Sequence, residues 1–80
     1  MSDAPQTLAD VPVGGNVTVT ALRGDSTFTQ RVREMGVLPG TKITVIRMAP
    51  LGDPIEIEVR HYKLSLRKVE AESIEVVPTS

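Results

Sequence analysis

Cysteine and tryptophan are absent from this 80-residue sequence, and Phe28 and Tyr62 are its only phenylalanine and tyrosine. Without cysteine, the chain can form neither a disulfide framework nor a thiolate metal site. Two rings cannot line the aromatic groove with which SH3 domains bind proline-rich peptides, and they cannot stack the bases of single-stranded RNA. The core must therefore consist of aliphatic side chains, and the cysteine-free composition suits a reducing cytoplasm.

Long apolar runs and an excess of one charge are missing as well. No stretch approaches the roughly 18 apolar residues that a membrane-spanning helix requires, and residues 1–10 lack the basic and apolar regions of a secretory signal. We therefore expect a cytoplasmic protein without membrane insertion. Nine Lys and Arg against ten Asp and Glu give a formal net charge of −1. This charge supplies no field that attracts a phosphate backbone, so nucleic acid is not an expected partner.

A catalytic apparatus cannot be recognised in the sequence. His61 is the single histidine, and it has no evident partner that would orient it as a general base. Neither a nucleophile elbow nor a phosphate-cradling glycine loop occurs. We therefore predict that the protein is not an enzyme, needs no cofactor and works by contacting another molecule.

Strand-like alternation dominates the sequence, whose length suits one domain. We expect a flexible lead-in at residues 1–6 and a single domain at 7–78. The alternating positions are Val17, Val19 and Ala21, then Ile55, Ile57 and Val59, and then Leu64 and Leu66, with a last strand at Ile74, Val76 and Val77. Residues 42–48 place Ile43 and Val45 on one face and Thr44, Ile46 and Met48 on the other, which predicts a central strand.

Helical signals are short. Thr27 and Gln30 have the spacing of a capping box, and Gly36 with Val37 fits the Schellman motif that ends a helix. The apolar face of this helix would carry Phe28, Val32 and Met35. Residues 38–41 match a type II turn, and single helical turns are expected at 7–11 and 67–73. The pattern predicts a mainly β fold, a small antiparallel barrel of about five strands with one or two short helices.

Three segments together resemble the ferrous-iron transport protein A family: residues 34–41 (EMGVLPGT), 49–55 (APLGDPI) and 64–68 (LSLRK). The resemblance extends from about Leu8 to Val77. It implies an SH3-like barrel and a cytoplasmic accessory or regulatory role in bacterial ferrous-iron uptake. The implied partner is the membrane transporter, ferrous-iron transport protein B, which carries a cytoplasmic GTP-binding domain. Family members often have glycine where this chain has His61, so a tight glycine turn is not expected there.

The segment 49–54, which we call the proline loop, is the first candidate contact surface. Its prolines stiffen the ends, and Leu51 would be an apolar anchor beside Gly52, Asp53 and Pro54. An equally weighted interpretation is a plain connector in which Asp53 bonds to nearby backbone.

A second candidate surface is the basic cluster Arg60, His61, Lys63, Arg67 and Lys68. A sheet face salt-bridged to Glu56, Glu58 and Glu70 is the favoured interpretation, and docking to an acidic protein is the functional one. The candidate partner-binding residues are therefore Leu51, Gly52, Asp53, Pro54, Arg60, Tyr62 and Arg67.

Direct metal binding is a different hypothesis. Oxygen ligands could come from Asp10, Asp53, Glu56, Glu58, Glu70, Glu72 and Glu75, and a nitrogen ligand from His61. The metal candidates are His61 and Glu58, and no spacing typical of a transition-metal site occurs. The alternatives to a transporter accessory are therefore a metal-binding sensor or chaperone and the SH3-like regulatory domain of a metal-dependent repressor. The sequence leaves self-association open.

Overall fold

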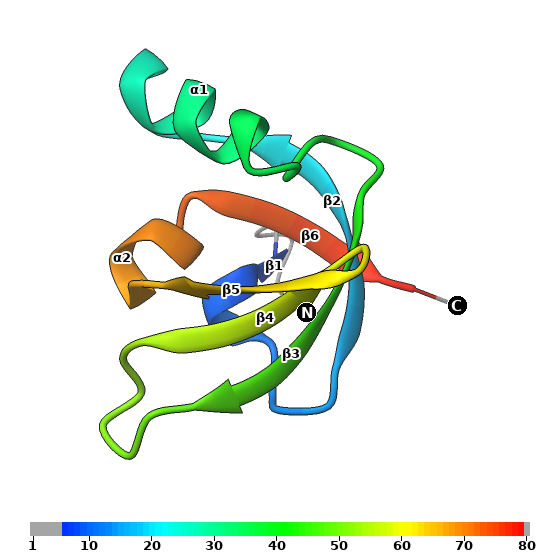
Figure 1. Ribbon diagram of the computed structural model, residues 1–80, viewed down its shortest axis with the longest axis vertical. Helices are drawn as coiled ribbons and strands as arrows, with labels where there is room; N and C mark the ends of the chain where they lie inside the picture. The colour runs from blue at the N-terminus through cyan, green and yellow to red at the C-terminus, as the bar shows by residue number, and fades with distance from the viewer. Residues whose placement is uncertain (1–5, 80) are drawn as a thin grey trace.

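A single antiparallel sheet forms most of the molecule in the computed structural model, which describes residues 6–79 (Figure 1). Its strands follow the spatial order β1-β6-β2-β3-β4-β5. The elements are β1 (Gln6–Thr7), a 3₁₀ turn (Leu8–Asp10), β2 (Asn16–Leu22), α1 (Ser26–Glu34), β3 (Lys42–Met48), β4 (Ile55–Val59), β5 (Tyr62–Leu66), α2 (Lys68–Ala71) and β6 (Ile74–Pro78). The predicted mainly β class is confirmed, with six strands in place of about five.

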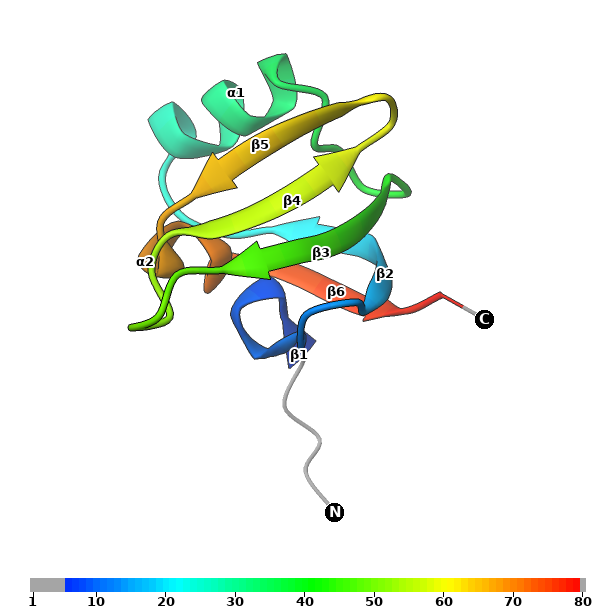
Figure 2. The same ribbon diagram turned by 60° about the horizontal axis from the view of Figure 1, so that its bottom comes forward.

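The additional strand is β1, in which Gln6 pairs with Val76 of β6. Gln6 belongs to the expected lead-in, whose other residues, 1–5, lie outside the described part. The sheet is strongly bent, so that β3, β4 and β5 curl over β2 and β6, and α1 lies along one side (Figure 2).

Two β-bulges produce part of this bend. The pairing register of β2 with β6 shifts between Val19 and Ala21, and that of β3 with β4 shifts between Val45 and Arg47. A bulge adds one unpaired residue to a strand and reverses the alternation beyond it. The predicted faces are therefore wrong at the strand ends. Met48 pairs with buried Ile55 on the inner face, and Ala21 pairs with Glu75 on the outer face.

Aliphatic side chains fill the inner face, as the composition predicts. Val17 and Val19 of β2 are buried, and so are the alternating residues of β4 and β6. The other buried hydrophobic residues are Leu8, Val11, Val32, Val37, Ile43, Val45, Leu66 and Ala71. Phe28 packs against this core from α1 and is only partly buried. Removing a Val, Leu or Ile side chain from water stabilises the fold by about 1.5–3 kcal/mol.

Helix α1 begins two residues earlier than the capping box predicts. Its N-cap is Asp25, whose carboxylate accepts the Phe28 N–H at 2.8 Å. Thr27 is already inside the first turn, so the predicted Thr27–Gln30 box is wrong. The predicted C-terminal motif is confirmed, because the N–H of Val37 donates to the carbonyl of Val32 at 2.9 Å.

Gly36 is required at the end of α1 for two reasons. Its φ is +94°, a left-handed conformation that strains any residue with a Cβ. A Cβ there would also lie 2.6 Å from the hydroxyl oxygen of Tyr62. Tyr62 therefore folds back from the β4–β5 hairpin onto the end of α1, with 40% of its surface exposed.

Gly36→Ala is expected to lower the free energy of unfolding by about 2 kcal/mol or more. The left-handed backbone contributes about 1–2 kcal/mol, and displacing the partly exposed Tyr62 ring adds to this loss. Urea unfolding followed by circular dichroism measures the loss. In a Tyr62→Phe background the loss should shrink, because the Tyr62 Cζ would lie 3.7 Å from the new Cβ. Equal losses in both backgrounds would leave backbone strain as the only cause.

Candidate partner-binding surface

The proline loop joins β3 to β4 and is closed by its own backbone. The Ala49 N–H donates to the Pro54 carbonyl at 3.0 Å, and the Gly52 N–H donates to the Ala49 carbonyl at 2.7 Å. Gly52 has a φ of +85°, and the Asp53–Pro54 peptide bond is cis. These contacts hold the loop in one defined conformation beside the sheet.

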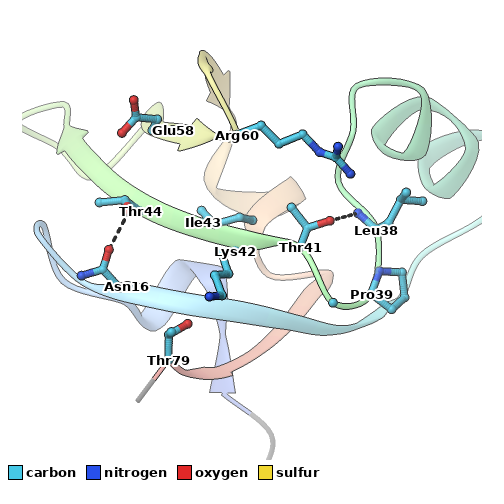
Figure 3. A pocket seen from close by; sticks show the side chains of 11 residues that line it. Asn16, Leu38, Pro39, Thr41, Lys42, Ile43, Thr44, Glu58, Arg60 and Thr79 are labelled. Carbon is cyan, nitrogen blue, oxygen red and sulfur yellow. Dashed lines mark hydrogen bonds between the residues drawn. The ribbon is translucent and has the colours of Figure 1, made fainter.

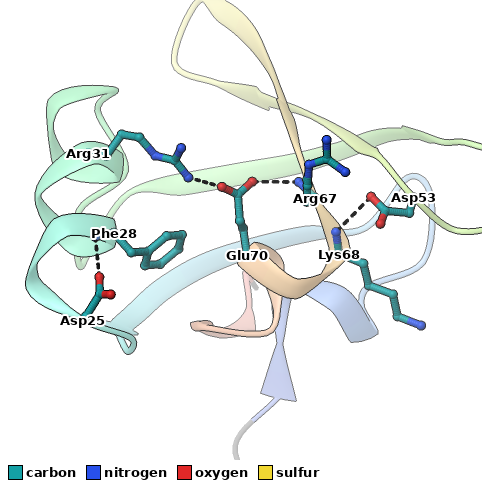
Figure 4. Close-up of polar contacts among 7 residues, drawn as sticks. All are labelled: Asp25, Phe28, Arg31, Asp53, Arg67, Lys68 and Glu70. Carbon is teal, nitrogen blue, oxygen red and sulfur yellow. Dashed lines mark hydrogen bonds and ion pairs between the residues drawn. The ribbon is translucent and has the colours of Figure 1, made fainter.

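Asp53 ties this loop to a segment farther along the chain. Its carboxylate accepts the backbone N–H of Lys68, the first residue of α2, at 3.1 Å (Figure 4). Leu51, by contrast, is 95% exposed. The connector interpretation therefore fits Asp53, which bonds to the backbone. The contact-surface interpretation fits Leu51, which is exposed to solvent.

Arg67 lies at the same end of the molecule, directly before α2. Its backbone N–H donates to Glu70 at 2.9 Å, and the other carboxylate oxygen of Glu70 contacts the guanidinium of Arg31 on α1. Glu70 thus links the two helices beside the proline loop (Figure 4).

Arg60, His61 and Tyr62 lie at the opposite end of the β4–β5 hairpin. Strands β4 and β5 have five residues each, which corresponds to about 16 Å. The turn contains only Arg60 and His61, because Val59 already pairs with Tyr62. Arg60 takes the left-handed conformation, with φ of 58°, so a tight turn forms without glycine. The candidate partner-binding residues therefore fall into two separate groups.

The predicted salt-bridged face does not form with the basic cluster. Within residues 6–79 the ion pairs are Arg23–Glu75 at 2.6 Å, Arg47–Glu56 at 3.4 Å, and Arg31–Glu70. Glu56 and Glu70 are thus paired with cations from outside the cluster. The hydrogen bond from Arg23 to Glu75 and the negative charge of Glu75 raise the pKa of Arg23. Neither residue is a candidate partner-binding residue.

The metal candidates are not brought into a ligand set. Glu58 lies on the outer face of β4 opposite Lys63, and His61 is in the hairpin turn. Among the described residues, no three His, Asp or Glu side chains converge on a position that could hold a metal ion. None of the helices in this part of the chain is long and apolar enough to cross a membrane.

A groove of about 820 Å³ runs over the outer face of β3 (Figure 3). The turn before β3 contributes Leu38 and Pro39 to it, and the neighbouring strand and hairpin contribute Glu58 and Arg60. Lys42 lines it from β3 itself. Sequence reasoning identified Arg60 but missed Leu38 and Lys42. Alternation along β3 predicts that Lys42 points outward. The groove itself could not be predicted from such a local pattern, because its walls come from segments that are separate in the sequence.

Comparison with known proteins gives a consistent result. The model of the FeoA domain family matches residues 6–78. A protein of Porphyromonas gingivalis, named Fe(2+) transport protein A/Fe(2+) transporter FeoB fusion protein, is 36% identical over 69 residues. That match covers 86% of this chain and 8% of the relative. The chain therefore spans only a small part of that protein.

Two solved structures combine similar sequence with similar fold. The FeoA protein of Chlorobium tepidum is 33% identical with a TM-score of 0.89, and the match covers 94% of this chain and 71% of that one. The FeoA-like protein of Clostridium acetobutylicum is 34% identical with a TM-score of 0.87, and the match covers 99% of this chain and 92% of that one.

More distant structures show the fold alone. A Stenotrophomonas maltophilia protein described as a prokaryotic SH3 domain protein has a TM-score of 0.80 at 24% identity, over 90% of this chain and 89% of that one. A manganese-dependent transcriptional repressor has a TM-score of 0.87 at 16% identity, over 99% of this chain and 39% of the repressor. The expected SH3-like fold is therefore confirmed, and the same fold occurs within a metal-dependent repressor.

Asp53→Ala is expected to lower the free energy of unfolding by about 1 kcal/mol, the usual effect of removing a side chain that accepts an N–H at a helix start. Thermal unfolding measures the loss, and hydrogen exchange should show a faster amide at Lys68. Asp53→Asn retains an acceptor oxygen and should recover most of the difference. Unchanged exchange at Lys68 in the alanine variant would mean that Asp53 does not anchor the loop.

Proposed function

The chain belongs to the FeoA family, and from this premise we propose that it is a cytoplasmic accessory protein of ferrous-iron uptake. It acts by direct contact with the cytoplasmic side of a FeoB-type transporter. The supporting observation is the Porphyromonas gingivalis relative, in which the two kinds of unit share one chain. A covalent link raises the effective concentration of one unit at the other, to the millimolar range for a short linker. An unlinked protein has to achieve the same contact through its own surface.

The proline loop is the surface that we assign to this contact. Leu51 is almost fully exposed, while the loop around it is fixed by the Ala49–Pro54 and Asp53–Lys68 hydrogen bonds. A loop that is already ordered loses little conformational entropy on binding. Leu51 supplies an apolar anchor, and Arg67 places a cation at the same end of the molecule.

The proposed action is regulatory and does not involve catalysis. A bound protein shifts a conformational equilibrium only by the difference between its affinities for the two states. The accessory protein must therefore bind one nucleotide-dependent state of the transporter more tightly than another.

Binding to the full-length transporter in detergent tests this function. The affinity of the immobilised protein should be measured with no nucleotide, with GDP and with a non-hydrolysable GTP analogue. We expect binding whose affinity depends on the nucleotide. Absence of binding in all three conditions would contradict direct contact, and equal binding in all three would contradict regulation.

Leu51→Asp is expected to weaken transporter binding at least tenfold, which corresponds to about 1.4 kcal/mol. Stability should stay within about 0.5 kcal/mol, as for other exposed positions. The matched control is Val77→Asp, which introduces the same charge at a residue of β6 that is 45% exposed. This control should bind normally. Normal binding by Leu51→Asp, or an equal loss in both variants, would remove the proline loop from the contact.

A further inference from the structure

The groove over β3 is a second surface, separate from the proline loop. Leu38 and Pro39 form an apolar wall on one side, and Leu38 remains 37% exposed. The outer face of the sheet forms a polar floor, where the Thr44 hydroxyl donates to the Asn16 side-chain oxygen at 2.6 Å. The groove thus offers an apolar side and a hydrogen-bonding side to one extended segment of a partner.

Two cations, Lys42 and Arg60, line the groove. Lys42 and Arg60 are both exposed, and neither takes part in an ion pair within the part of the chain that the structure describes. Glu58 is the acidic residue of the groove, and it lies opposite Lys63 across the β4–β5 pair. Two cations and one carboxylate therefore line the groove, and their formal charges sum to a small positive excess.

A second, independent observation is the backbone conformation of Arg60. Its φ of 58° is a conformation that glycine adopts with less strain. Figure 3 shows its side chain directed across the groove toward Leu38. Strained residues cluster where the side chain has a function. A two-residue hairpin turn requires a left-handed residue, and at this position Arg60 places its guanidinium over the groove.

We propose that this groove binds an extended acidic segment of a partner protein. Carboxylates of the segment meet the guanidinium of Arg60 and the ammonium of Lys42, and an apolar side chain of the segment packs on Leu38. Arginine suits this task because its planar group can bind a carboxylate through two parallel hydrogen bonds. This proposal does not depend on the identity of the transporter.

A polyanion such as RNA fits the groove less well. The formal net charge of −1 provides no long-range attraction for a polyphosphate backbone. None of the aromatic residues on which single-stranded nucleic acids stack lies in the groove. An acidic peptide with apolar residues instead matches both the cations and the Leu38 wall.

Nuclear magnetic resonance titration of the ¹⁵N-labelled protein tests the proposal. The probe is an acetylated and amidated pentapeptide that alternates glutamate with leucine, and the matched control replaces each glutamate with glutamine. Inorganic phosphate and polyuridylate are titrated in parallel. We expect shifts at residues 38–44 and 58–60 with the acidic peptide, weakened by added salt. Equal shifts with the glutamine peptide, stronger binding of phosphate or polyuridylate, or shifts elsewhere would overturn the proposal.

Two substitutions separate binding from folding. Lys42→Gln should lower the peptide affinity at least threefold and leave the midpoint temperature of unfolding unchanged. Arg60→Gly should lower the affinity at least fivefold and raise the midpoint temperature, because glycine relieves the turn while the guanidinium is lost. Unchanged affinity in either variant would contradict the role of that cation. A lower midpoint temperature in Arg60→Gly would contradict the argument from strain.

Discussion

Burial of branched aliphatic side chains on one face of a bent sheet is the interaction on which the other features depend. The two bulges, at Thr20 and Ile46, turn the ends of β2 and β3 so that Leu22 and Met48 join the inner face. A flat sheet of this size would leave those side chains without neighbours to bury them. The bend therefore lets a chain with two aromatic rings enclose its core.

The same framework positions the exposed residues. The inner residues of β4 fix the hairpin on the sheet, so its two ends present different surfaces about 16 Å apart. The proline loop displays an apolar side chain, and the groove beside the hairpin turn displays two cations. Family membership links the chain to FeoA proteins, and these two surfaces are the ones proposed for its contacts.

Much of the fold follows from the sequence, because alternation and turn chemistry act over a few residues. The strands, the Schellman motif at Gly36 and the turn before β3 belong to this local class. The bulges do not, since an extra residue leaves the apolar pattern ambiguous. The helix start was ambiguous as well, because Asp25 and Thr27 are both good caps.

The candidate surfaces depended more on tertiary structure than the strands did. The bond between Asp53 and Lys68 joins residues 15 apart, and the groove brings Leu38 next to Arg60. No local pattern encodes such distances. The distribution of charge along the sequence also gave the wrong ion pairs. Glu56 and Glu70 pair with Arg47 and Arg31, which are not part of the basic cluster.

The contact between Tyr62 and Gly36 has a spectroscopic consequence. Tyr62 is the only tyrosine, and the chain has no tryptophan, so its near-ultraviolet fluorescence comes almost entirely from the junction between the hairpin and α1. Any partner that lifts the hairpin from the helix will change the environment of this ring. The native protein therefore carries its own optical reporter where the hairpin meets α1, and no label has to be attached.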